Sequence, residues 1–150
     1  MRNLFKLKNH ENQRGVAAVE FAIVLPLLLF LFIGITEFGI AYYNKQVVTN
    51  ASREGARAGI VAGTSESEIQ QVAYNYAKDR LITFGTNTFS IVDEEDESII
   101  IDDCKSDGEY CTVTVTFNYT YLILQGFSFF GANFGPNLNI SSSTVMKMEP

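Results

Sequence analysis

The feature that most constrains this chain is a long uncharged apolar run that follows a basic N-terminal segment. No charged residue occurs in residues 21–36, and the wider segment 16–40 is apolar enough to be a candidate membrane helix. Crossing a hydrocarbon core takes about 20 helical residues at roughly 1.5 Å each, so this segment is long enough. The preceding segment 1–14 has four basic residues against one acid. By the positive-inside rule, the N-terminus lies in the cytoplasm and everything after Tyr43 lies outside.

Two carboxylates mark the ends of the apolar run. Glu20 lies at its inner end, where an ionisable group is costly unless it has a partner, which indicates a functional residue. The alternative for Glu20 is an incidental carboxylate at the interface. Glu37 lies near the outer end, and we expect it to be hydrated there.

An ordinary secretory signal is the other explanation of the apolar run. Such signals have an apolar region of about 7–15 residues and a small-x-small cleavage site. A matching pattern occurs at residues 39–41, but Glu37 lies just before it and the leader would be 41 residues long. These dimensions favour a membrane segment that is retained.

Composition restricts the function classes. Residues 16–150 contain seven basic and sixteen acidic residues, a net charge of −9. Binding to nucleic acid requires basic patches, so the outer part is not expected to bind it. The only histidine, His10, precedes the apolar run. The chain has no phosphate-binding loop, nucleophile elbow or cluster of thiolate and imidazole ligands, so we expect no enzymatic activity, cofactor or metal centre.

Helical periodicity continues past the membrane. It predicts one helix over residues 16–62, about 70 Å long, with residues 16–43 as its membrane part. Pro26 is expected to kink or locally unwind this helix, because proline removes a backbone N–H. Ser65 and Glu68 match a capping box at the start of a second amphipathic helix that stops before Gly85.

The period changes from 3.6 to 2 after Gly85. Residues 111–121 alternate strictly between apolar and polar side chains, which predicts a half-buried antiparallel strand. Shorter apolar segments at residues 89–91 and 99–101 and a final pattern over 138–148 predict further strands. The predicted fold is therefore α+β, in which residues 63–150 form an outer domain with a helix and a small antiparallel sheet.

Two stretches carry a family resemblance. Residues 15–21, Gly-Val-Ala-Ala-Val-Glu-Phe, resemble a class III prepilin signal. Residues 15–26 and 51–57 resemble the TadE-like minor pilins of tight-adherence (Tad) pili. The resemblance implies that a prepilin peptidase cuts between Gly15 and Val16, so that residues 1–15 are a leader and Glu20 is the fifth mature residue.

The same resemblance implies a structural role in a pilus. Glu20, Phe21 and Pro26 would belong to the segment used in assembly, and Glu20 would pair with the N-terminal amine of its own or a neighbouring subunit. The partners would be the peptidase, other pilins, the inner-membrane assembly platform and the lipid membrane. A minor pilin is favoured because major Tad pilins are much shorter than this chain.

Three further patterns lie outside the membrane segment. Cys104 and Cys111 would meet an oxidising compartment, which favours a disulfide over a metal site. Small residues recur every four positions and form a smooth helical stripe that packs either on the chain's own sheet or on the next subunit's helix; they are Ala51, Gly55, Gly59 and Gly63. Residues 93–97 are all acidic and predict either a solvated turn or, less readily, a calcium site.

Two functions remain open at this point. The favoured one is a structural pilin subunit without catalysis. The alternative is an uncleaved, single-pass, membrane-tethered module that binds or senses something outside the cytoplasm.

Overall fold

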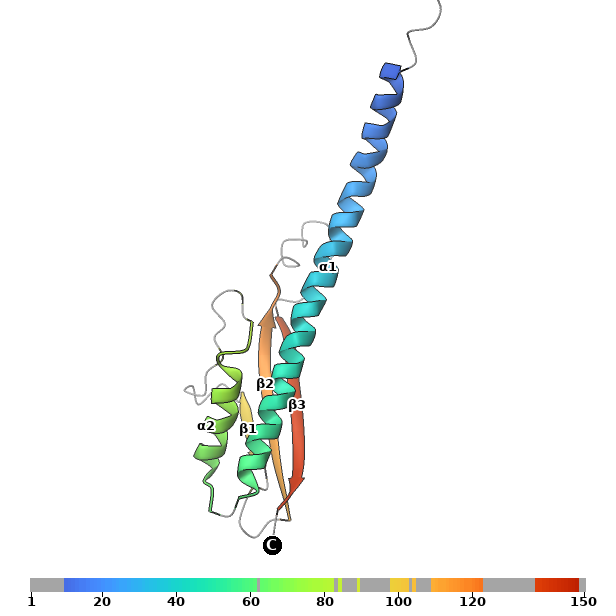
Figure 1. Cartoon of the computed structure of the whole chain (residues 1–150). Coiled ribbons are helices and arrows are strands. Elements are labelled where there is room, and N and C mark those ends of the chain that lie inside the picture. Colours follow the sequence, from blue (N-terminus) through green and yellow to red (C-terminus); the bar gives the residue numbers. More distant parts are fainter. Residues whose placement is uncertain are drawn as a thin grey trace, which may run out of the picture. The chain divides into compact units, whose positions relative to one another are not determined.

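The computed structural model describes residues 10–61, 63–82, 84, 89, 98–102, 104, 109–122 and 137–148, with side chains from residue 15 onward. These residues form two helices and three strands (Figure 1): α1 (His10–Gly59), α2 (Glu66–Ala77), β1 (Ile99–Asp102), β2 (Tyr110–Thr120) and β3 (Asn137–Lys147). The predicted α+β class, with a long N-terminal helix, a second helix and a small antiparallel sheet, is confirmed. The chain divides into two compact units, Met1–Thr36 and Glu37–Pro150, and α1 contributes to both.

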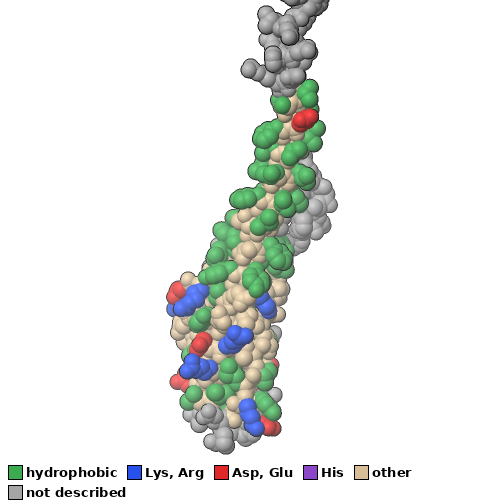
Figure 2. Space-filling model, turned by 45° about the vertical axis from the view of Figure 1, so that its right-hand side comes forward, with side chains coloured by type: hydrophobic (Ala, Val, Ile, Leu, Met, Phe, Trp, Pro, Cys, Tyr) green, Lys and Arg blue, Asp and Glu red, His purple; other side chains and the backbone are tan. Residues whose placement is uncertain are grey.

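In the first unit, α1 is apolar and exposed around its whole circumference. The six successive side chains of residues 27–32 are all exposed, and six residues cover more than one helical turn. Hydrophobic side chains cover this part of the helix in Figure 2. A helix that is apolar all round needs an apolar environment, either a protein core or a bilayer. By length and composition, α1 fits a single-pass membrane anchor.

Pro26 does not interrupt α1. The local unwinding expected there is absent, since α1 remains helical on both sides of the proline. Proline fixes φ near the helical value and removes one donor, so the helix loses a single hydrogen bond while its path can continue. The expected helix bounds are also adjusted: α1 begins at His10, upstream of Val16, and ends at Gly59, before Ala62.

The second unit is built on a three-stranded antiparallel sheet with β2 in the centre. The register places Ile101 opposite Val113 and Phe117 opposite Ile140. Along β2 the odd-numbered residues are buried while the even-numbered ones are more exposed, which matches the predicted alternation. The short strand expected over residues 89–91 is not formed at Phe89, and residues 90–91 lie outside the described residues.

Both helices cover the buried face of this sheet. The core joins residues of α1, α2 and the strands; its fully buried members include Val48, Ala51, Ile69, Ala73, Val113, Val115 and Tyr119. α2 begins with the predicted capping box, in which the Ser65 hydroxyl accepts from the Glu68 N–H and the Glu68 carboxylate accepts from the Ser65 N–H. The buried side chains of α2 are Ile69, Ala73 and Ala77, whereas Val72 is 39% exposed.

Candidate functional site

The predicted cleavage junction lies inside α1. Gly15 and Val16 are both exposed, and a Cβ added at Gly15 would meet nothing within 4 Å. The last residues of the predicted leader, from His10, belong to the same helix. Glu20 follows Val16 by one helical turn and is also exposed. Among the described residues, Glu20 takes part in no ion pair, so any partner for its charge comes from outside them.

The environment of Glu37 differs from the one that the sequence analysis predicted. Glu37 is 2% exposed and therefore is not the hydrated interfacial carboxylate that we expected. One carboxylate oxygen accepts a hydrogen bond from the backbone N–H of Leu122, at 2.5 Å. Glu37 is the first residue of the second unit, and Leu122 follows β2 by two residues, so the hydrogen bond links α1 to the end of β2.

A tyrosine hydroxyl lies buried in the same region. The Tyr119 hydroxyl has no hydrogen-bond partner among the described residues. Burial, with the negative charge of Glu37 adding to it, raises the pKa of Tyr119 to about 12. The raised pKa extends the pH range over which the hydroxyl stays neutral, and a buried hydroxyl without a hydrogen-bond partner costs free energy.

Besides Glu37, the side chains of Asn44, Ser52 and Lys45 make polar contacts between α1 and the rest of the second unit. The Asn44 amide donates to the Ile82 carbonyl and accepts from the Ile82 N–H, each at 2.9 Å. The Ser52 and Thr144 hydroxyls lie 2.8 Å apart. The Lys45 ammonium donates to the Ser141 carbonyl. Asn44 and Ser52 are fully buried. Their hydrogen bonds take the place of those that water would make, and a buried polar group without a partner would cost free energy.

The small-residue stripe faces the chain's own sheet and second helix. Ala51 is fully buried in the core. A Cβ added at Gly55 would lie 3.0 Å from a methyl carbon of Val113 and 3.2 Å from the Cβ of Ala73. Gly55 therefore lets α1 approach β2 and α2 together, which is the intramolecular alternative for the stripe.

Gly59 makes the closest approach of the stripe. A Cβ there would lie 2.4 Å from the Cys111 sulfur and 3.1 Å from the Ile69 Cδ1. Real Cβ atoms do not approach other heavy atoms this closely, so only glycine fits without displacing a neighbour. The last residue of α1 is thus in direct contact with the sulfur of Cys111.

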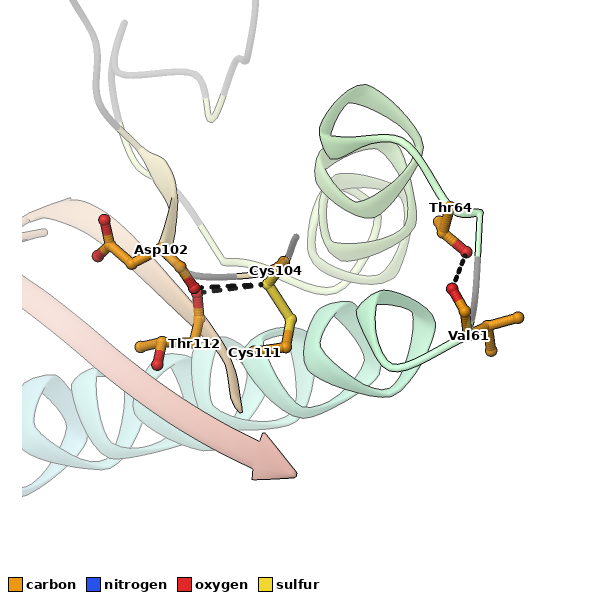
Figure 3. Close-up of a disulfide and its surroundings, with 6 residues drawn as sticks. All are labelled: Val61, Thr64, Asp102, Cys104, Cys111 and Thr112. Carbon is orange, nitrogen blue, oxygen red and sulfur yellow. Dashed lines mark hydrogen bonds between the residues drawn. A yellow bond between two sulfur atoms is a disulfide. The ribbon is translucent and has the colours of Figure 1, made fainter. Parts of the chain in front are cut away.

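Gly63 does not share this role. It has a positive φ of 88°, and a Cβ there would meet nothing within 4 Å. It lies in the turn after α1, where the Thr64 hydroxyl donates to the Val61 carbonyl at 3.0 Å (Figure 3). Glycine is favoured here by its backbone conformation, because side chains disfavour positive φ.

Cys104 and Cys111 form a disulfide, and their Cα atoms lie 4.1 Å apart (Figure 3). Cys104 follows the end of β1 by two residues, and Cys111 is the second residue of β2. Both cysteines are buried in the core. The bridge therefore closes the connection between two antiparallel strands directly beneath the end of α1.

The possible calcium site of the sequence analysis involves the acidic run and none of the residues described above. The acidic run 93–97 lies outside the described residues. Within the part of the chain that the structure describes, no group of three or more potential metal ligands occurs. The described residues therefore do not decide between a solvated turn and a calcium site in the acidic run.

Sequence comparison supports the resemblance stated above. The model of the TadE-like protein family matches residues 15–57, which run from the predicted cleavage glycine through most of α1. This is consistent with a TadE-like, pilin-type protein. Residues 58–150 lie outside the match. No curated protein and no solved structure matched the chain.

Proposed function

We propose that this chain is a minor pilin of a Tad-type pilus, cut by a prepilin peptidase and assembled through its N-terminal helix. The observation that carries the proposal is the TadE-like match over residues 15–57, because it includes both the predicted junction and the apolar helix. The fold agrees with a structural role: one long helix that can enter a membrane and an α+β unit packed on its outer half.

Processing would occur between Gly15 and Val16. The glycine has open space around it and is exposed, so a peptidase could reach the bond. Glycine also weakens a helix by about 1 kcal/mol relative to alanine, which favours local opening of α1 at this point. The basic leader 1–15 would remain on the cytoplasmic side, as the positive-inside rule requires.

Cleavage would create a charge partner for Glu20. The new amine of Val16 would lie one helical turn before this carboxylate, and a negative group in the first turn also complements the helix dipole. Within an apolar environment, the amine and the carboxylate of adjacent subunits would set the register between their helices, even without adding net stability. Glu20 would therefore serve assembly.

Within the second unit, the outer part of α1 would be held firmly on the sheet. Gly55 and Gly59 bring α1 into contact with β2, and the Asn44 and Ser52 side chains add buried hydrogen bonds. The disulfide fixes the strand connection against which α1 ends.

Processing provides the test. We would express the full chain together with its prepilin peptidase and measure the intact mass of the membrane-extracted protein. The wild type and Gly15→Ala should lose residues 1–15, whereas Gly15→Leu should keep them because its bulky side chain crowds the site of cleavage. Gly34→Leu is the matched control, since Gly34 also has open surroundings in α1 and should be processed. A wild-type protein that keeps its leader would favour the membrane-tethered module instead.

Assembly tests the role of Glu20 in the native host. Glu20→Ala should still insert into the membrane, since loss of a charge makes insertion easier. It should also be processed, but pilus number should fall. Normal piliation by this variant would refute a specific role for Glu20.

A further inference from the structure

The two sulfurs of the Cys104–Cys111 disulfide belong to different parts of the sheet. Cys111 is the second residue of the central strand β2, it lies opposite Met146 of β3, and it is fully buried. Cys104 lies two residues beyond the end of β1, and the pairing of β1 with β2 ends before it, at Asp102. The Cys104 residue keeps 8% of its surface exposed. The bridge therefore joins a residue within the paired strands to one outside them.

The end of α1 covers the Cys111 sulfur more closely than the Cys104 sulfur. A Cβ added at Gly59 would lie 2.4 Å from the Cys111 sulfur but 3.4 Å from the Cys104 sulfur, and only the second is an ordinary contact distance. The same Cβ would lie 3.1 Å from the Cδ1 of Ile69, a fully buried residue of α2. A reagent can therefore reach the Cys111 sulfur only after α1 has moved away from β2.

The two sulfurs also differ in the part of the fold that must open to expose them. A local movement at Cys104 leaves every strand pair of the sheet in place, because this residue pairs with no strand. Exposure of Cys111 requires the central strand or the last turn of α1 to leave the core. Local openings need less free energy than the opening of core elements. The Cys104 sulfur should therefore be accessible more often than the Cys111 sulfur.

Backbone carbonyls provide a place for a free thiol at Cys104. The carbonyl oxygens of Asp102 and Thr112 lie 3.6 Å and 3.9 Å from the Cys104 sulfur (Figure 3). A disulfide sulfur carries no hydrogen, but after reduction the Cys104 thiol can donate to either oxygen. Among the described residues, no such acceptor lies beside the Cys111 sulfur. The Cys104 side of the bridge can therefore hold a free thiol without a change in the strands.

We infer that Cys104 is the sulfur at which the folded chain exchanges its disulfide with an external dithiol, and that Cys111 is the internal partner. One thiolate of the dithiol attacks the Cys104 sulfur, the bond to Cys111 breaks, and the Cys111 sulfur leaves with the electron pair and takes up a proton. The second thiolate of the dithiol then displaces Cys104, so the dithiol is oxidised to a disulfide and the bridge is reduced by two electrons. Formation of the bridge follows the reverse path. The exchange requires neither cleavage nor assembly.

A trapped mixed disulfide tests this inference in the wild type. We would incubate the full chain in detergent with reduced glutathione, quench with acid, digest with pepsin and locate the bound glutathione by peptide mass spectrometry. Glutathione should occur on Cys104 at least about tenfold more often than on Cys111, which corresponds to about 1.4 kcal/mol of additional opening free energy. Equal amounts on the two cysteines, or an excess on Cys111, would overturn the inference.

Two single-cysteine variants compare the sulfurs directly, since Cys111→Ser and Cys104→Ser each lose the bridge and keep one thiol. We would measure the rate at which each thiol reacts with dithiodipyridine, an aromatic disulfide, relative to the rate for the same variant in guanidinium chloride. The Cys104 thiol should react faster, at a rate that low urea does not change. The Cys111 thiol should react faster as urea is added, because its exposure opens core surface. Equal relative rates with the same urea dependence would contradict the inference, and the wild-type trap does not depend on the folding of either variant.

Gly59→Ala tests whether the end of α1 is the cover of Cys111. In the Cys104→Ser background it should raise the reaction rate of the Cys111 thiol, because the new Cβ displaces α1 or the sulfur. In the Cys111→Ser background it should leave the rate of the Cys104 thiol unchanged. Gly39→Ala is the matched control and should change neither rate, since a Cβ at Gly39 meets nothing within 4 Å. An equal increase at both thiols would show that one opening exposes both sulfurs and would overturn the inference.

Discussion

Replacing Gly59 by alanine tests the close approach of α1 to β2. The new Cβ would lie 2.4 Å from the Cys111 sulfur and 3.1 Å from the Ile69 Cδ1. Both neighbours are fully buried, so neither can move aside without disturbing the core. Overpacking of this kind costs about 1–3 kcal/mol. Alanine returns at most about 1 kcal/mol in helix propensity, and less at the last residue of a helix.

We therefore expect Gly59→Ala to lower the free energy of unfolding by about 1–2 kcal/mol, the difference between these two effects. For a unit of this size, the melting temperature should fall by several degrees. This change in melting temperature would be measured by thermal unfolding of the full chain in detergent, monitored by near-ultraviolet circular dichroism. Gly39→Ala is the control, because a Cβ at Gly39 meets nothing within 4 Å and α1 should become slightly more stable.

A double-mutant cycle with Cys111 identifies the atom responsible. In a Cys111→Ser background, the bulky sulfur is absent and Gly59→Ala should cost less than in the wild type. Equal costs in both backgrounds would show that the sulfur contact is not responsible. If Gly59→Ala instead stabilises the protein as Gly39→Ala does, the close packing of α1 on β2 is refuted.

Two more predictions concern the core of the second unit. Cys104→Ser should destabilise this unit by about 2–3 kcal/mol, the chain-entropy estimate for a short loop. The second unit should then be cleaved faster by a protease while the membrane helix is unaffected. An unchanged rate of proteolysis would contradict this prediction. Tyr119→Phe should be neutral or stabilising at pH 7, because it removes a buried hydroxyl without a described partner. The pKa of Tyr119 is raised from 10.0 to about 12 in the folded protein, so the unfolded chain ionises first and stability falls as pH rises between those values. Tyr119→Phe should lose less stability over this range in chemical unfolding; an equal loss would show that Tyr119 is not the group involved.

The features that sequence predicted well depend on local chemistry. The Ser65 capping box needs only residues within one turn, and the alternation along β2 needs only one exposed and one buried face. The disulfide was predicted from two cysteines in the outer domain, where the compartment is expected to be oxidising, and they are seven residues apart in the chain. In each case the determining residues lie close together in the chain.

The features that sequence missed depend on distant partners. Glu37 is buried because it accepts from the Leu122 N–H, 85 residues later in the chain, and no local pattern indicates that contact. Asn44 similarly bonds Ile82, 38 residues away. The one feature of the sequence that could have indicated a buried Glu37 is its position directly after the apolar run. Gly63 continued the four-residue spacing of the stripe, but the helix ends at Gly59, so spacing alone could not exclude it.

The N-terminus of this chain in sheared, purified pili is the most direct measurement of the proposed function. Peptide mass spectrometry of that fraction should find the chain with an N-terminal peptide that begins Val16-Ala17-Ala18, and none that contains residues 1–15. Detection of the chain only in membranes, with residues 1–15 intact and absent from the pilus fraction, would contradict its role as a processed minor pilin.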